Sequence, residues 1–257
     1  MLIVEYFPNI NKIMFIFLRL VLAHLIGDFP LQFNKVYNLK QKGLIGIIPH
    51  ATIIMLCYII LSLPYLNLPG LWGFIFFLTI THLFQDSIKL SYKGMKFSFL
   101  FYILDQIFHL SFISMILLTN LRQIAPLDNP KDNLIISFYN NNLTITYLIF
   151  LILATYNGYF MIRNIKTTII KKFTPSTTFE KWYGILERAG LVSIFLLEKY
   201  LFIYISFILI LRPIVFIISR KKLSITEEFI SGLETILSWS IGIVSGLCLC
   251  IVKHTFI

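Results

Sequence analysis

Long apolar runs separated by short polar clusters dominate the sequence. A helix needs about twenty apolar residues to cross the hydrocarbon of a bilayer, and a run of that length recurs along the whole chain. The pattern predicts an all-α, polytopic transmembrane helix bundle of about eight spans, or of seven if the run interrupted by Glu198 and Lys199 is one tilted helix. The expected spans are 13–32, 47–64, 70–90, 97–119, 143–162, 180–197, 199–219 and 226–252.

The composition strengthens this interpretation. Hydrophobic residues make up 58% of the chain and charged residues only 13%, whereas a soluble domain is about a quarter charged. The three cysteines, Cys57, Cys248 and Cys250, all lie in apolar stretches without a paired metal-ligand spacing. The numbers therefore exclude a disordered chain, a disulfide scaffold and a nucleic-acid-binding domain.

The basic residues indicate an orientation. Of the 22 Lys and Arg residues, fourteen fall in the loops that follow the first, third, fifth and seventh spans or within two residues of those loops. Short loops rich in Lys and Arg stay in the cytoplasm, so both termini are expected outside. Positive charge near anionic headgroups also explains the net charge of +10, with membrane lipid as the partner and no nucleic acid.

Histidine and aspartate recur together inside these apolar spans. An ionisable residue within a membrane span is costly, which makes it a functional candidate. Two side chains four residues apart share one face of an α-helix. Three such pairs occur, in the first, third and fourth spans: His24 with Asp28, His82 with Asp86, and Asp105 with His109. The second span adds His50, directly after Pro49.

The expected topology places all seven groups at a similar depth, within about 15 Å of the cytoplasmic surface. Imidazole and carboxylate are the ligands that Zn, Mn and Fe prefer, and seven of them exceed the need of one tetrahedral ion. The sequence thus predicts a divalent metal site, with Zn favoured over Mn or Fe, and a site of two ions uses these ligands most completely. Its expected ligands are His24, Asp28, His50, His82, Asp86, Asp105 and His109, and Asp86 and Asp105 are also the expected catalytic carboxylates.

Other polar residues near these pairs are candidates for substrate binding. Lys89 lies one turn beyond the third-span pair, where it binds an anionic group or extends to the lipid headgroups. Gln32 and Gln106 fit hydrogen bonds to substrate or to the ligands, or ordinary bonds between helices. In the second half of the chain, Glu187 and Arg188 are expected to pair structurally with other helices rather than to line the same cavity.

The pattern divides the chain into two regions of one bundle. Residues 1–120 form a four-helix N-terminal membrane region with the His/Asp cluster, and residues 121–257 supply the C-terminal membrane helices.

The N-terminal motifs resemble those of the bacterial and phage membrane proteins catalogued as domain of unknown function 3307. The resemblance depends on the run from Ala23 to Gln32, on His50 with Tyr58, on Thr81-His82 with Asp86 and Lys89, and on Leu104-Asp105-Gln106 with His109. It implies a multi-pass protein of the bacterial inner membrane and no particular activity. The His-x-x-x-Asp pairs are also similar to those of all-helical zinc phospholipases and nucleases, which is an analogy of site rather than of fold.

Three functions compete at this point. The first is a membrane-embedded, metal-dependent hydrolase that acts on a phosphate-containing or lipid-linked substrate at the cytoplasmic leaflet. The second is a transporter of an ion, a metal or protons that uses the same ligands, and the third is a non-catalytic membrane assembly partner. Transporters favour midplane sites on broken helices and internal repeats, whereas this cluster lies toward one membrane face and no repeat occurs. The sequence therefore favours the hydrolase, with protein partners left open.

Overall fold

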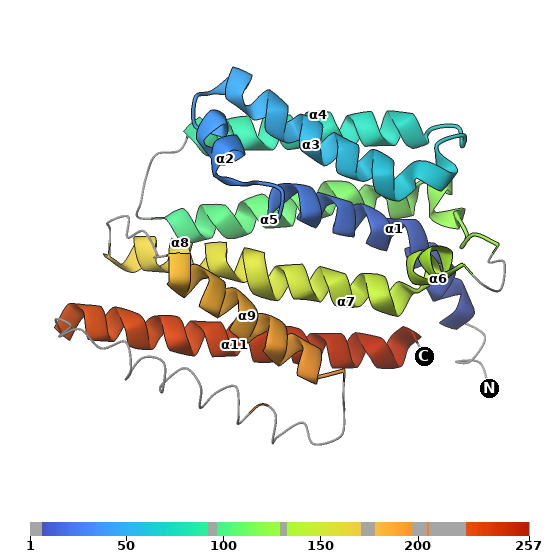
Figure 1. The fold of residues 1–257 in the computed structure, drawn as a ribbon. Helices are drawn as coiled ribbons and strands as arrows, with labels where there is room; N and C mark the ends of the chain where they lie inside the picture. The colour runs from blue at the N-terminus through green and yellow to red at the C-terminus, as the bar shows by residue number, and fades with distance from the viewer. Residues whose placement is uncertain are drawn as a thin grey trace. The chain divides into compact units, whose positions relative to one another are not determined.

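The computed structural model describes residues 7–91, 97–128, 133–170, 178–196, 205 and 225–256. These residues form helices and the connections between them, and no strand occurs in this part of the chain, as the all-α prediction requires. They form two compact units (Figure 1). Apart from the last two residues, the first comprises Met1–Gly94 and Leu100–Ile149, and the second Met95–Phe99 and Phe150–Thr255. The sequence pattern places a boundary after residue 120. The division between the two compact units falls further along the chain.

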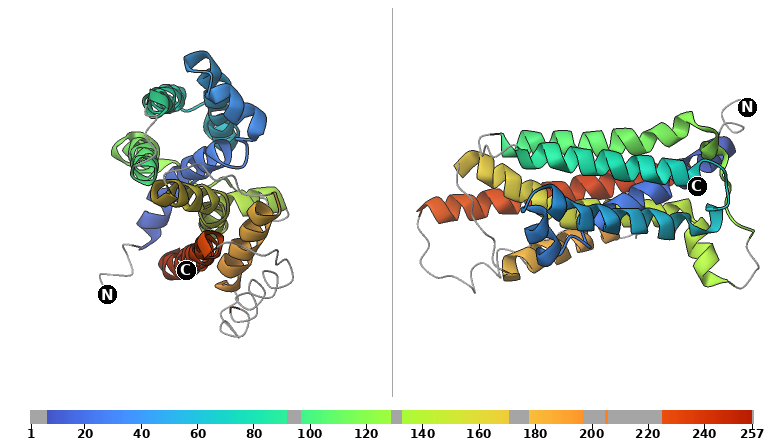
Figure 2. Two further views of the ribbon diagram at one scale, coloured as in Figure 1. Left: turned by 90° about the vertical axis from the view of Figure 1, so that its left-hand side faces the viewer. Right: turned by 90° about the horizontal axis from the view of Figure 1, so that it is seen from above.

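Four long helices build the first unit: α1 (Phe7–Asp28), α3 (Leu44–Ser62), α4 (Leu71–Ser91) and α5 (Ser98–Ser114). They lie side by side with alternating directions, as Figures 1 and 2 show. The end of α1, the start of α3, the end of α4 and the start of α5 consequently lie at one end of the unit. The short helix α2 (Asn34–Lys40) lies at this same end and packs on α3.

Two glycines shape the connections at opposite ends of α3. Gly43 has a φ of 97° and precedes α3, and Gly70 has a φ of 86° and precedes α4, a backbone conformation that other residues rarely adopt. Gly46 permits the close contact of α2 with α3, because a Cβ atom there would lie 1.8 Å from the carbonyl oxygen of Leu39. The chain is thereby folded back so that Lys40 lies beside the first turns of α3.

Five helical stretches of the described residues are long and apolar enough to cross a membrane: Leu44–Tyr65, Leu71–Ser91, Ser98–Leu118, Asn142–Ile170 and Gly232–Lys253. They correspond to the second, third, fourth, fifth and eighth expected spans. The first expected span, 13–32, overlaps α1, and the sixth, 180–197, overlaps α9 (Thr178–Ile194), but neither helix is among these five. The seventh, 199–219, lies outside the described residues except for residue 205, so the total of eight stays a prediction.

A buried arginine stabilises the first unit at the end away from α2. Arg19 of α1 donates hydrogen bonds to the side chain of Asn142 and to the carbonyl oxygen of Tyr139. Its guanidinium carbon lies 3.5 Å from the ring centroid of Phe15. The hydroxyl of Tyr139 in turn donates to the carbonyl oxygen of Leu61. These contacts attach α6 (Leu134–Asn140) and the start of α7 (Asn142–Ile152) to the first unit.

The second unit contains α8 (Gly158–Ile170), α9 and α11 (Ile225–Phe256), together with the π-helical turn η4 (Leu153–Asn157). A π-helical turn leaves carbonyl groups without their usual partners. Arg188 of α9 donates to two of them, those of Ala154 and Thr155, and to the hydroxyl of Ser238. Glu187 accepts hydrogen bonds from Ser238 and from Trp239. The structural pairing expected for Glu187 and Arg188 agrees with these contacts.

Candidate metal centre

The seven expected ligands lie at the end of the first unit where α2 packs. His24 and Asp28 lie in the last turns of α1, His50 in the second turn of α3, and the other pairs in the last turns of α4 and the middle of α5. Every one of the seven is at most 7% exposed. The alternating helix directions bring groups that are far apart in sequence to one level, and their side chains are shielded from solvent.

Three imidazole rings form the centre of this group. The ring centroids of His24 and His109 are 4.7 Å apart, those of His24 and His82 are 5.4 Å apart, and those of His82 and His109 are 4.4 Å apart. The Nδ1 atoms of His82 and His109 are separated by 3.3 Å. Side chains from α1, α4 and α5 therefore meet, well within the 8 Å beyond which a shared site would be excluded.

The carboxylates surround these rings. On α4, His82 Nε2 lies 3.2 Å from Asp86 Oδ2, and on α5, His109 Nε2 lies 3.3 Å from Asp105 Oδ1, as the four-residue spacing predicts. Asp28 behaves differently, because its Oδ1 contacts Nε2 of His50 at 3.2 Å. The last residue of α1 thus faces α3, whereas His24, one turn earlier, faces α4 and α5.

Three sets of ligand atoms are close enough to hold an ion. They are His24, His82 and His109; Asp28, His50 and His82; and Asp86, Asp105 and His109, and within each set the atoms lie within 4.8 Å of one another. Ligand atoms around one bound ion are roughly 3–4 Å apart, so each set needs side-chain adjustments of only about 1 Å. The second and third sets share no residue, and the ring of His24 contacts His82 of one set and His109 of the other. Two ions therefore fit, each with three protein ligands.

The hydrogen bonding of the centre also fits a metal. Both ring nitrogens of His24 are buried and have no hydrogen-bond partner among the described residues, and the same is true of Nδ1 of His50. A buried polar atom without a partner costs about 1–3 kcal/mol. The arrangement is therefore unfavourable for a purely structural cluster, and a divalent ion would bind the one lone pair that each neutral imidazole offers.

Two lysines reach the cluster from its α2 end. Lys89 Nζ lies 2.5 Å from Asp105 Oδ2, and Lys40 Nζ lies 2.6 Å from Asp86 Oδ2. Sequence analysis singles out Lys89 but misses Lys40, which is 5% exposed. The only signal is its spacing, because Lys40 follows the buried Val36 by one turn and shares its face of α2.

The two glutamines expected to bind substrate each contact one of the expected ligands. Nε2 of Gln32 lies 3.3 Å from Nε2 of His50, and Nε2 of Gln106 donates to Oδ2 of Asp105 over 3.2 Å. Of the three roles considered for Gln32 and Gln106, these contacts match hydrogen bonds that orient metal ligands. A role in substrate binding stays a prediction for both glutamines and for Lys89.

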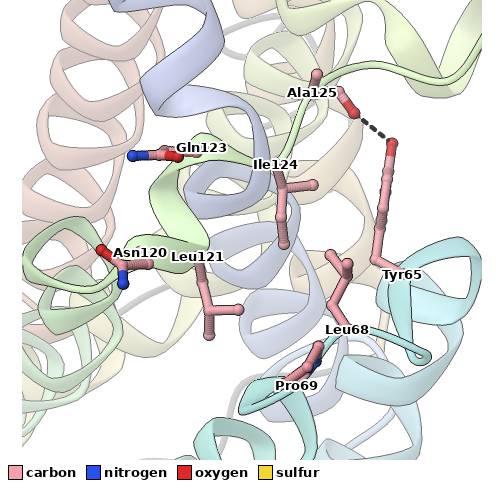
Figure 3. A pocket seen from close by; sticks show the side chains of 8 residues that line it. All are labelled: Tyr65, Leu68, Pro69, Asn120, Leu121, Gln123, Ile124 and Ala125. Atoms are coloured by element: carbon pink, nitrogen blue, oxygen red, sulfur yellow. Dashed lines mark hydrogen bonds between the residues drawn. The ribbon is translucent and has the colours of Figure 1, made fainter.

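A separate pocket of about 490 Å³ lies in the first unit near Tyr65 (Figure 3). The residues that line it are Tyr65, Leu68, Pro69, Asn120, Leu121, Gln123, Ile124 and Ala125. Tyr65 is fifteen residues beyond His50, so the pocket lies about 22 Å along α3 from the cluster. It contains no ionisable group other than the Tyr65 phenol, which donates to the carbonyl oxygen of Ala125.

The fold and the cluster thus define an all-helical protein with helices suited to a membrane and a buried His/Asp centre. Residues 16–135 match the model of the family described as "Protein of unknown function (DUF3307)". The matched segment holds the entire cluster, and the match confirms the resemblance that the motifs indicate. No curated protein and no solved structure matches the chain.

Proposed function

We propose that the protein is a membrane-embedded, metal-dependent hydrolase that acts on a phosphate-containing or lipid-linked substrate at the cytoplasmic leaflet of the bacterial inner membrane. The observation that carries this proposal is the position of His24. Its buried ring has no hydrogen-bond partner among the described residues and contacts His82 of one donor set and His109 of the other. The charge pattern of the loops supports a multi-pass arrangement with both termini outside.

The donor chemistry supports a divalent ion of the Zn, Mn or Fe type. All seven groups are imidazoles or carboxylates, which suit these ions. Each disjoint set supplies three protein ligands. Closed structural sites usually have four protein ligands, whereas catalytic sites have three and keep one position for water or substrate. With His24 as a further ligand to one ion, the other ion keeps three protein ligands, and this number favours a reactive centre over a structural one.

The residues around the centre have distinct roles in this proposal. A bound divalent ion supplies Lewis acidity toward a phosphoryl oxygen. Asp86 and Asp105 are both ligands and the carboxylates available to accept a proton from the attacking water. Lys89, with its ammonium group beside Asp105, is placed to bind an anionic oxygen of the substrate. Burial of the whole group excludes bulk water and strengthens each of these electrostatic interactions.

The helices that hold the cluster favour this function over transport. Transporters commonly bind their cargo on interrupted helices near the membrane midplane. Here α1, α3, α4 and α5 are continuous at the cluster, including α3 at its internal Pro49. The cluster also lies at one end of the four helices. A rigid frame of this kind suits a fixed set of ligands.

Metal content of the purified protein tests the proposal. The protein, dialysed without chelator, should retain one or two divalent ions per chain, and a chelator should lower its thermal midpoint, because bound metal stabilises the folded state. Phosphate release from phosphatidic acid in mixed micelles should require the ion. If no ion is retained and the chelator leaves the midpoint unchanged, the proposal is wrong.

A further inference from the structure

Both lysines at the centre, the buried Lys40 and the partly exposed Lys89, pair with carboxylates of the same donor set. Lys40 contacts Asp86 and Lys89 contacts Asp105, and these two aspartates form one set with His109. The other disjoint set differs, because its aspartate, Asp28, pairs with His50. The carboxylates of one set are therefore paired with lysines, whereas the carboxylate of the other set is paired with a histidine.

From this asymmetry we propose that Lys40 and Lys89 block the second metal position until a phosphate group binds to them, so that the second ion and a phosphate anion bind together. This inference rests on the proposed function and names phosphate as the group recognised by the same centre. The ligand chemistry is that of a phosphate monoester or free phosphate, with at least two anionic oxygens available for two ammonium groups.

The first step of the argument is competition between cations. An ammonium group at 2.6 Å or 2.5 Å from a carboxylate oxygen occupies the place of a metal ion at that oxygen. Two positive charges a few ångströms apart repel strongly in a buried environment. The carboxylate of the other set, Asp28, pairs with His50, so an ion in the set of Asp28, His50 and His82 displaces no lysine from its own carboxylate, although Asp86, the partner of Lys40, also lies 3.6 Å from His50. A divalent ion can enter the set of Asp86, Asp105 and His109 only after the lysines move.

The second step is the charge of the whole centre. Three carboxylates and two ammonium groups leave one net negative charge when the histidines are neutral. One divalent ion changes this to one net positive charge, and a second ion changes it to three. Uncompensated charge in a low-dielectric interior is strongly unfavourable. A phosphate dianion would bring the centre with two ions back to one net positive charge.

The third step is the position of the lysines. Lys40 comes from α2, outside the four-helix frame, and the side chain of Lys89 is 36% exposed. Both flexible chains can therefore rotate toward an anion at the α2 end without moving a ligand-bearing helix. Lysine binds phosphate well as a point charge. The displaced ammonium groups would then gain new partners, while their former carboxylates become free for the second ion.

Binding of Mn²⁺ to the purified full-length protein in phospholipid-free detergent tests the proposal. Without phosphate one ion should bind tightly, and inorganic phosphate should increase the affinity for a second by about 5- to 150-fold, the usual range for coupled sites. The coupling is reciprocal, so Mn²⁺ should increase phosphate affinity by the same factor. Lys40→Met should bind the second ion without phosphate and lose most of the coupling.

Matched variants separate this effect from misfolding. Lys40→Arg keeps the positive charge and should keep the coupling, and Lys42→Met removes a nearby exposed lysine and should change nothing. Nanodiscs of phosphatidylcholine with and without phosphatidic acid distinguish the sources of the phosphate group. An effect of the lipid alone assigns the site to a headgroup, and an equal effect of inorganic phosphate assigns it to phosphate in general.

The outcomes also separate this inference from the proposed function. The inference is wrong if one Mn²⁺ ion binds with an affinity that neither inorganic phosphate nor phosphatidic acid changes. It is also wrong if two ions bind in the absence of both. Either result leaves the proposed metal centre intact. If no ion binds under any condition, both proposals are wrong.

Discussion

The two compact units both bury polar clusters, but they satisfy them differently. In the second unit, Arg188 and Glu187 make hydrogen bonds to Ser238 and to backbone or side-chain groups of neighbouring helices. In the first unit, the described residues leave both nitrogens of His24 without a partner. Buried polar groups are normally hydrogen-bonded, and each exception calls for an explanation. The second network is thus satisfied within its own unit, whereas the first contains buried nitrogens without a partner among the described residues, as the proposed metal centre requires.

The largest effect should come from removing a carboxylate of the first unit. Asp86→Ala and Asp105→Ala should each abolish metal retention at their set and any hydrolysis, because each removes one of three protein ligands. Metal content per chain and phosphate release are the measurements. Asp128→Ala, which removes an exposed carboxylate outside the cluster, is the control and should retain both. Full metal content in the Asp86 and Asp105 variants would contradict the assignment of these ligands.

The next largest effect concerns stability of the second unit. Arg188→Met should destabilise the protein by about 3 kcal/mol, since it leaves the carbonyl groups of Ala154 and Thr155 without their donor. Metal content should be unchanged, because every expected ligand belongs to the first unit. Denaturation in detergent measures the first quantity and metal analysis the second. Loss of metal from a folded Arg188 variant would show that the two networks are not independent.

Much of the candidate centre could be predicted from the sequence because helical spacing and topology are local signals. The four-residue spacing fixes the contacts within His82/Asp86 and Asp105/His109. The positions of basic residues along the chain predict that all seven ligands lie at one level. The structure gives the same grouping, with the ligands at one end of α1, α3, α4 and α5.

The contacts that depend on tertiary structure could not be predicted in this way. The partner of Asp28 is His50 rather than His24, because the direction of a side chain at a helix end depends on the neighbouring helix. No feature of the sequence separates Lys40 from Lys35 and Lys42. Lys40 is brought to the centre by the turn at Gly43, which folds α2 onto α3. Arg19 sits in an apolar span, and its partners Tyr139 and Asn142 follow more than a hundred residues later.

A smaller effect is expected at the edge of the centre. Lys89→Ala should raise KM for a phosphate-containing substrate by about 10- to 100-fold, the loss of one charge-assisted hydrogen bond. The first metal ion should stay bound, because Lys89 is not a ligand. Steady-state kinetics and metal analysis on the same sample check both parts. An unchanged KM would mean that this lysine serves only to neutralise Asp105.

The smallest effect sharpens the contrast between satisfied and unsatisfied clusters. His24→Leu replaces a buried ring that has no hydrogen-bond partner with an apolar side chain of similar size. In the presence of a chelator this variant should be more stable than the parent by about 1 kcal/mol, because it removes the desolvation penalty of two unpaired nitrogens. In the presence of metal the order should reverse, since the parent then gains the binding free energy of a ligand that the variant lacks. Thermal midpoints of both proteins with and without chelator measure the four states. A variant that is less stable than the parent under both conditions, with the same loss each time, would show that His24 stabilises the fold by packing alone.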